Sequence, residues 1–329
     1  MTRYSESNER NSVVGIVAFV LVPSVAVVGL LLLLFQAVEW RLLRVDVNTS
    51  NGGILFYDDQ QADRDKLRFG VATMVNIEST YRKYHRISET VAASLGSRDA
   101  FLIEPSYRDL RRALEHGELD VAMTCTGIYT HAALAGGARL VAKPKYEGDL
   151  TYHGLLVVRA ESPVESFDDL RGKEIIFTDP ESFTGHILPI AEIIRRGHDP
   201  ERFFSRARFA GCHDVAIKGV DRRIADAAAV SSIKWHLMTR DDPTLADRLR
   251  VVWRSEEFGL PPVLAPPTME DDSFSALREV FLNLHENENV SAALRELSIE
   301  RFVEVSESDY RSALDVHELV KRSVEGAAP

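Results

Sequence analysis

The sequence predicts an α/β protein of two lobes, preceded by one transmembrane helix. The first observation behind this prediction is an uncharged, strongly apolar run over residues 13–38. The second is an alternation of strand-like and helix-like segments from residue 66 onward, which indicates mainly parallel sheets covered by helices. The third is a pair of extended segments, 152–159 and 249–255, that are placed to cross between the two lobes.

The apolar run is long enough to cross a hydrocarbon core as a helix, and Trp40 follows it where an interfacial aromatic residue is expected. A cleaved signal peptide is the alternative, but the run exceeds a usual h-region and no small-x-small cleavage site follows it. Arginines flank both ends, so charge gives no orientation. The expected organisation is a tail (1–12), an anchor (13–38), a tether (39–65), lobe 1 (66–151 with 256–325) and lobe 2 (152–255).

Local patterns place the elements of each lobe, because apolar alternation predicts strands and a 3.6-residue period predicts helices. Lobe 1 is expected to hold strands at 66–72, 100–104, 117–123 and 139–143, and helices at 79–95, 107–116 and 130–135. Lobe 2 is expected to hold strands at 152–159, 173–177, 209–210, 225–230 and 249–253, and helices at 187–194 and 213–220. After a Pro-rich stretch, the C-terminal third is expected to be helical at 272–284, 290–297 and 308–324.

Composition excludes several classes of function. The formal net charge is −11 and no basic run is present, which argues against nucleic acid as a partner. The two cysteines, Cys125 and Cys212, are too few for a disulfide scaffold and are expected to be two unrelated buried thiols. No His/Cys/Asp spacing indicates a metal or another cofactor, and Ser182 has no neighbouring base, so we expect no enzyme.

The most informative motif is Ser182-Phe183-Thr184-Gly185, which lies between a strand-like run and an apolar helix. The free N–H groups of the first helical turn would converge there with the hydroxyls of Ser182 and Thr184, and the helix dipole adds partial positive charge. Such a socket holds a phosphate-like oxyanion without Lys or Arg. The alternative is an ordinary helix N-cap, which the motif taken alone favours.

The surroundings of this motif resemble the phosphonate-type substrate-binding proteins of ABC importers. That family carries a strand, a Ser-Pro turn, DLKGK, a second strand, Asp-Pro-x-Ser-Thr-Ser-Gly and a helix ending in Gly-x-Asp-Pro. The chain carries YHGLLVVRAESPVESFDDLRGKEIIFTDPESFTGHILPIAEIIRRGHDPERFF in the same order. The runs YRDLRRALEHGELDVA, AGCHDVAIKGVDRRIADAAAV and LRVVWRSEEFGLPPVLAP match further family units, so the resemblance covers roughly residues 66–320.

The resemblance implies a type-II periplasmic-binding-protein fold that works outside the cytoplasmic membrane. It implies that Ser182, the Phe183 amide, Thr184 and Gly185 hold the ligand oxygens. Phe183 departs from the family pattern by replacing a hydroxyl residue, and its ring either faces the cleft or packs beneath it. His213 matches a histidine that points at the same oxyanion, where an imidazole N–H is a suitable donor and a protonated ring a stronger one. A capping or surface role is the alternative for an isolated histidine.

Further candidates lie at the lobe 1 side and at the crossing. Thr124 and Thr126 end a predicted strand and Tyr129 lies one turn beyond, where strand ends meet a cleft. Residues 74–77 are expected to form the opposite lip. Tyr152 either closes over the ligand or packs the hinge. Asp226 matches a family aspartate with a role toward amine-bearing ligands, although a solvated or structural role is favoured here.

These observations favour a membrane-tethered extracytoplasmic receptor for a phosphonate, phosphite or phosphate-like oxyanion, which delivers its ligand to an ABC permease and ATPase. Lobe closure would desolvate the anion. The alternative from another class is a sensor domain that signals to a membrane partner. A sulfonate or another small organic anion is the alternative ligand, because the socket mainly recognises oxyanion geometry.

Overall fold

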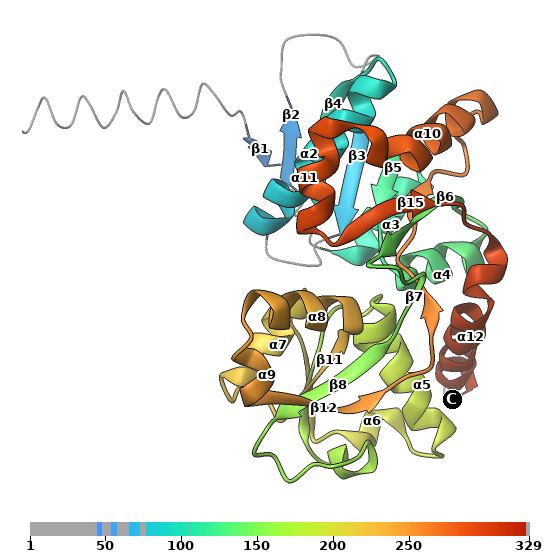
Figure 1. Cartoon of the computed structure of the whole chain (residues 1–329). Helices are drawn as coiled ribbons and strands as arrows, with labels where there is room; N and C mark the ends of the chain where they lie inside the picture. Colours follow the sequence, from blue (N-terminus) through green and yellow to red (C-terminus); the bar gives the residue numbers. More distant parts are fainter. Residues whose placement is uncertain (1–44, 48–53, 58–65, 73–76, 105, 327–329) are drawn as a thin grey trace, which may run out of the picture. The chain divides into compact units, whose positions relative to one another are not determined.

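The computed structural model describes residues 45–47, 54–57, 66–72, 77–104 and 106–326 (Figure 1). The predicted tail and anchor, most of the tether and most of the lip at 74–77 lie outside these residues. Within the described part, no helix combines the length and the apolar character that crossing a membrane requires. Two short strands, β1 (Val45–Val47) and β2 (Ile54–Tyr57), precede the first lobe.

The first lobe is built on a mixed sheet in which β3 runs parallel to both of its neighbours. From β4 onward the strand order is β4 (Arg98–Glu104), β3 (Lys66–Ala72), β5 (Val121–Met123), β14 (Val263–Ala265), β6 (Arg139–Tyr146) and β15 (Ile299–Val303). Its helices are α2 (Ile77–Ser94), α3 (Tyr107–Glu115), α4 (Thr126–Ala135), α10 (Asp271–Asn283), α11 (Glu288–Glu296) and α12 (Arg311–Gly326), with short turns η4 (Leu284–Glu286) and η5 (Glu307–Tyr310).

The second lobe is built on a five-stranded sheet. The strand order is β10 (Arg206–Phe209), β9 (Glu174–Phe177), β11 (Ala227–Ser231), β8 (Gly154–Arg159) and β12 (Leu249–Arg254). Strand β9 is parallel to β10 and β11, whereas β8 is antiparallel to β11 and β12. The helical segments are η2 (Asp168–Leu170), η3 (Phe183–Ile187), α5 (Leu188–Arg195), α6 (Pro200–Phe203), α7 (His213–Asp221), α8 (Ser232–Asp241) and α9 (Leu245–Arg248).

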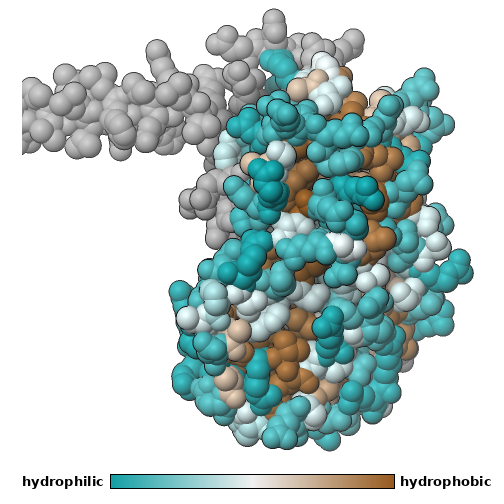
Figure 2. Space-filling model, viewed as in Figure 1, coloured by the Kyte–Doolittle hydropathy of each residue, from teal (hydrophilic) through white to brown (hydrophobic). Residues whose placement is uncertain are grey.

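Both faces of this second sheet are buried. Leu156 and Ile175 belong to one apolar cluster, while their chain neighbours Leu155 and Ile176 belong to another on the opposite face. Successive strand residues point to opposite faces, so a sheet covered on both sides needs nearly continuous apolar strands. On the face seen in Figure 2, hydrophilic residues make up most of the surface and apolar residues show between them.

The two lobes are joined by a paired crossing. Strand β7 (Thr151–Tyr152) pairs antiparallel with β13 (Phe258–Gly259). Next to this ribbon, the Gly154 backbone N–H donates to Ser255 Oγ at 2.9 Å, so the two crossings also hold each other. The C-terminal helix α12 packs with α5 of the second lobe through Val316 and Leu188 in one apolar cluster.

Most predicted elements are present, and the differences have local causes. Strand β14 was not expected because it holds three residues between Pro262 and Pro266. Helix α4 begins at Thr126 rather than at residue 130, because the thiol of Cys125 caps it by accepting from the Ile128 N–H at 3.4 Å. Cysteine is not among the usual N-cap residues. Helix α8 and strand β15 were also not expected.

Candidate ligand-binding site

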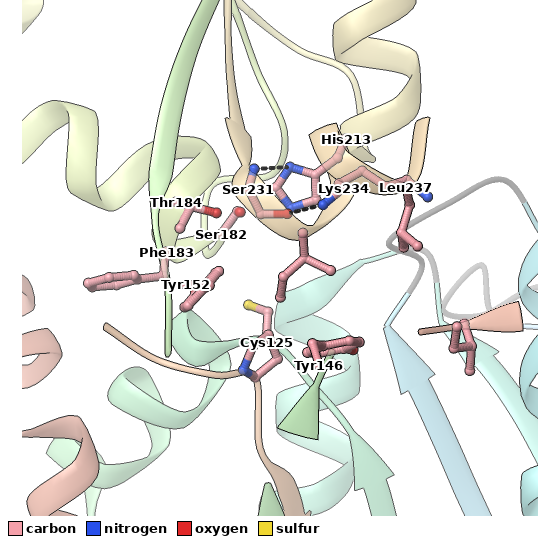
Figure 3. A pocket seen from close by; sticks show the side chains of 13 residues that line it. Cys125, Tyr146, Tyr152, Ser182, Phe183, Thr184, His213, Ser231, Lys234 and Leu237 are labelled. Carbon is pink, nitrogen blue, oxygen red and sulfur yellow. Dashed lines mark hydrogen bonds between the residues drawn. The ribbon is translucent and has the colours of Figure 1, made fainter. Parts of the chain in front are cut away.

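A small cavity of about 40 Å³ lies where residues of both lobes meet (Figure 3). An enclosed water needs roughly 10–15 Å³ on this scale, so the space suits a compact group. No carboxylate is found among the described residues that line it. These are Cys125, Tyr146, Tyr152, Ser182, Phe183, Thr184, His213, Ser231, Ile233, Lys234, Leu237, Pro261 and Leu297.

Three helix N-termini of the second lobe reach this cavity. Ser182 is the N-cap of η3, which continues into α5; His213 is the first residue of α7; and Ser231 is the N-cap of α8. These helices follow β9, β10 and β11, whose carboxyl ends meet at one sheet edge because the strands are parallel. Each terminus adds partial positive charge and unpaired N–H groups to the same place.

The Ser182–Gly185 segment forms a tight turn at the cavity. The Gly185 N–H donates to Ser182 Oγ at 3.1 Å, which leaves the Ser182 O–H to donate elsewhere. Gly185 itself is not a lining residue, but a Cβ there would lie 2.3 Å from Thr178 Oγ1 and 2.7 Å from Ser182 Oγ. Only glycine fits this turn.

The Phe183 ring packs beneath the site rather than facing an open cleft. Its exposed fraction is 1%, and it meets the Phe258 ring edge-on with centroids 4.8 Å apart. The hydroxyl lost at this position is therefore replaced by apolar packing against the crossing strand β13. The backbone of the turn is anchored to the core through this ring.

Tyr152 and Thr184 both line the wall of the cavity. Burial raises the pKa of Tyr152 and outweighs the lowering effect of the Thr126 and Thr184 side chains. The phenol is therefore neutral at ordinary pH. Tyr152 lines the cavity and belongs to the crossing ribbon, and its closing over a ligand stays a prediction.

His213 presents a defined donor. The Ser231 backbone N–H donates to His213 Nδ1 at 3.3 Å. The Thr178 hydroxyl, 3.0 Å from the same nitrogen, can rotate to suit, whereas the backbone N–H cannot. Burial, followed by the charge of Lys234, lowers the pKa of His213 to about 3. The ring is thus neutral with its proton on Nε2, on the cavity side in Figure 3, and not the imidazolium expected to be the stronger donor.

Besides Gly185, four predicted site residues do not line the cavity. Thr124 Oγ1 donates to the Pro262 carbonyl at 2.8 Å, and Thr126 Oγ1 donates to the Gly259 carbonyl at 3.0 Å. The Tyr129 ring is buried against Tyr310, with centroids 4.7 Å apart. These three side chains hold lobe 1 to the returning chain.

The fourth, Asp226, precedes β11. It accepts from the Glu174 N–H at 2.9 Å and lies 3.7 Å from Arg159 in an ion pair, a structural arrangement. Both cysteines are free and buried, and only Cys125 lines the cavity.

The sequence interpretation missed Lys234, which lines the cavity from the first turn of α8. Its helix was not expected, so its side chain had no assigned position. A signal was present in Ser231, which ends a strand and caps the next helix by accepting from the Lys234 N–H at 3.1 Å. Ser182 likewise caps a helical segment, η3, although residues 178–181 separate it from the end of β9.

A two-lobed α/β fold with a donor-lined cavity between the lobes defines a periplasmic-type solute-binding protein. Residues 69–310 match the family described as ABC transporter, phosphonate, periplasmic substrate-binding protein. The chain belongs to this family, which confirms the family expected from the motifs. Its members are transport binding proteins and not enzymes.

Similar proteins agree with this assignment. The chain is 19% identical over 236 residues to the phosphonates-binding periplasmic protein of Escherichia coli, with 70% of each chain covered. It is 26% identical over 190 residues to the phosphate-import protein PhnD of Mycolicibacterium smegmatis, covering 53% of this chain and 57% of that protein.

Solved structures show the same fold. PhnD1 of Prochlorococcus marinus, in complex with methylphosphonate, superposes with a TM-score of 0.70 at 18% identity, covering 79% of this chain and all (100%) of that one. A binding-protein component of an ABC phosphonate transporter from Pseudomonas aeruginosa gives 0.67 at 18% identity, covering 81% and 100%. The two-lobed periplasmic-binding-protein fold predicted from the sequence is confirmed.

Proposed function

We propose that this chain binds a small tetrahedral oxyanion, namely a phosphonate, phosphite or phosphate, and delivers it to an ABC permease and its ATPase. The observation that carries the proposal is the convergence of three helix N-termini with the hydroxyls of Ser182 and Thr184 and Nε2–H of His213 around one cavity. These groups donate hydrogen bonds, and oxyanions need several donors in a compact arrangement.

The ligands in the names of similar proteins support an oxyanion head group. They are phosphonates in Escherichia coli, phosphate in Mycolicibacterium smegmatis and methylphosphonate in Prochlorococcus marinus. Their common part is a phosphorus centre with several oxygens. Ser182, the Phe183 amide, Thr184 and His213 would bind this part, and Gly185 would shape the turn.

The apolar run at 13–38 would hold the binding domain at the outer face of the cytoplasmic membrane. The lobes would comprise 66–151 with 256–325, and 152–255, and would close on the ligand about the β7–β13 ribbon. A tether over 39–65 would keep the loaded domain within reach of the permease, which raises its effective concentration there.

A thermal-shift titration of the full chain in mild detergent tests the ligand class. Phosphate, phosphite, methylphosphonate and sulfate are each titrated into the wild type and into the double variant Thr184→Ala/His213→Ala. A saturating ligand at 100 times its Kd should add about 2.7 kcal/mol of stability to the wild type. The double variant should lose this stabilisation because both changes remove donors to one group. Undiminished stabilisation of the folded double variant would overturn the assignment of the socket.

A further inference from the structure

Lys234 is a buried cation without a carboxylate partner in the described part of the chain. Its exposed fraction is 8%, and it lines the proposed oxyanion cavity. It lies in the first turn of α8, where the positive end of the helix dipole disfavours a second positive charge. A buried unpaired ammonium is costly, so this position calls for an anion.

The charged side chains around Lys234 do not supply the anion that its ammonium group calls for. Asp214 of α7 has the largest attractive effect on Lys234, but it also forms an ion pair with Lys218, with Oδ2 and Nζ 3.7 Å apart. Lys83 of α2 repels Lys234, while Asp241 of its own helix acts in the attractive direction. None of these groups forms an ion pair with the ammonium within the described residues.

The cavity has two chemically different ends. In Figure 3 the Lys234 side chain extends toward Leu237, away from Ser182 and Thr184. One end therefore offers hydroxyls, amides and an imidazole N–H, all neutral, and the other offers a formal positive charge. The apolar side chains of Ile233 and Leu237 line the same cavity.

We propose that Lys234 determines ligand specificity by charge: it favours phosphonates that carry a second anionic group and excludes aminoalkylphosphonates. A ligand carboxylate would neutralise the ammonium, whereas a ligand amine would bring two like charges together in a poorly solvated site. Asp226, which matches a family aspartate with a role toward amine-bearing ligands, accepts from the Glu174 N–H and pairs with Arg159. This inference rests on the proposed oxyanion function of the same cavity.

The test compares phosphonoacetate, methylphosphonate and 2-aminoethylphosphonate by calorimetric titration of the full chain in detergent. The wild type should prefer them in that order. Lys234→Met keeps the length of the side chain but removes the charge. Its affinity for phosphonoacetate should therefore be at least tenfold lower than that of the wild type, on the order of the loss of a buried charge pair. Its affinity for 2-aminoethylphosphonate should be higher. Lys234→Arg keeps the charge and should keep the wild-type order of affinities. This variant still tests the role of the charge if Lys234→Met does not fold.

Lys321→Met on the exposed part of α12 is the matched control and should leave all three affinities unchanged. If the wild type binds none of the three ligands, the proposed oxyanion function fails together with this inference. If methylphosphonate binds but the order of the three ligands is the same in Lys234→Met as in the wild type, the role of Lys234 is overturned while the oxyanion function stands.

Discussion

Arg111 of α3 donates two hydrogen bonds to the carboxylate of Glu181, the residue that immediately precedes Ser182. The Nε–Oε2 and Nη2–Oε1 distances are both 3.0 Å. The two side chains are 16% and 5% exposed, so the pair is largely buried. Because α3 belongs to the first lobe and Glu181 to the second, this bidentate ion pair joins the lobes beside the candidate site.

Removing Arg111 should strongly destabilise the protein. In Arg111→Met the Glu181 carboxylate would remain buried without its main partner, and such broken pairs cost about 3–5 kcal/mol. The double variant Arg111→Met/Glu181→Met should be more stable than Arg111→Met, because it removes the stranded charge as well. Urea unfolding of the three variants and the wild type measures both differences.

Arg322→Met is the control for this prediction. Arg322 pairs with Glu318 on the surface of α12 at 77% exposure, where an ion pair contributes about 1 kcal/mol or less. If Arg111→Met were as mild as Arg322→Met, the buried pair would not be a structural link. If the double variant were the least stable of all, the penalty would come from lost packing and not from the unpaired carboxylate.

Ser182→Ala should separate capping from binding. The change removes a helix cap, which costs about 1 kcal/mol, and a donor to the proposed oxyanion, which should weaken phosphate or methylphosphonate about tenfold. Ser106 is a matched control, because it caps α3 by accepting from the Asp109 N–H at 3.2 Å and does not line the cavity. Ser106→Ala should lower the melting temperature similarly and leave affinity unchanged. Equal affinity in both variants would make Ser182 a cap only.

Local sequence patterns were sufficient to predict the parts of the candidate site that are built from residues adjacent in the chain. The Ser182–Gly185 turn is built from adjacent residues, and its cap bond spans Ser182 to Gly185. Its strand-to-helix transition is therefore visible in the sequence. The same is true of His213, whose place at the start of α7 follows from the Gly211 turn and the helix pattern behind it.

The rest depends on partners far apart in the chain. Thr124 stands at a strand end, as a ligand-binding residue would, but its hydroxyl is taken by the Pro262 carbonyl 138 residues later. Only the pairing of β5 with β14 brings these groups together, and β14 is too short to leave a pattern. Lys234 was missed because α8 has no clear apolar stripe and its burial is a property of the assembled lobes.

Gly127→Ala should separate α4 from the binding turn. A Cβ at Gly127 would lie 1.9 Å from the Glu181 carbonyl oxygen and 2.7 Å from the Phe183 nitrogen. Because both contacts are to backbone, they cannot be relieved by a side-chain rotation, and α4 would have to move away. We expect at least tenfold weaker oxyanion binding, on the order of a lost pair of hydrogen bonds, and a larger radius of gyration in X-ray scattering.

The control for this prediction is Gly137→Ala, just beyond the other end of α4. The nearest atoms to a Cβ there belong to the flexible Glu115 side chain, with its Cγ at 3.3 Å. This variant should keep the wild-type affinity and radius of gyration. Unchanged affinity in Gly127→Ala would mean that α4 does not need to approach the turn for binding.

Two buried histidines and a half-buried one should make the ligand-free protein sensitive to acid. Burial is the main cause that lowers the pKa of His213 and His317 to about 3 and that of His131 to about 4. An unfolded histidine titrates near 6.5, so between pH 6.5 and about 4 the unfolded chain binds more protons and stability falls as pH falls. Asp179 acts in the opposite direction, because burial raises its pKa to about 6.

The test is the slope of the unfolding free energy against pH between 6 and 4, measured by urea unfolding at several pH values. Each histidine should contribute about 1.4 kcal/mol per pH unit where it is protonated only in the unfolded chain. His317→Asn retains an amide near the position of Nδ1, which lies 2.8 Å from Thr130 Oγ1. It should lower the slope by the contribution of one proton, about 1.4 kcal/mol per pH unit. His285→Asn, at an exposed position, should leave the slope unchanged. If the slope were equal in His317→Asn and the wild type, His317 would bind its proton over the same pH range in the native and unfolded states. Burial would then not be keeping the ring neutral.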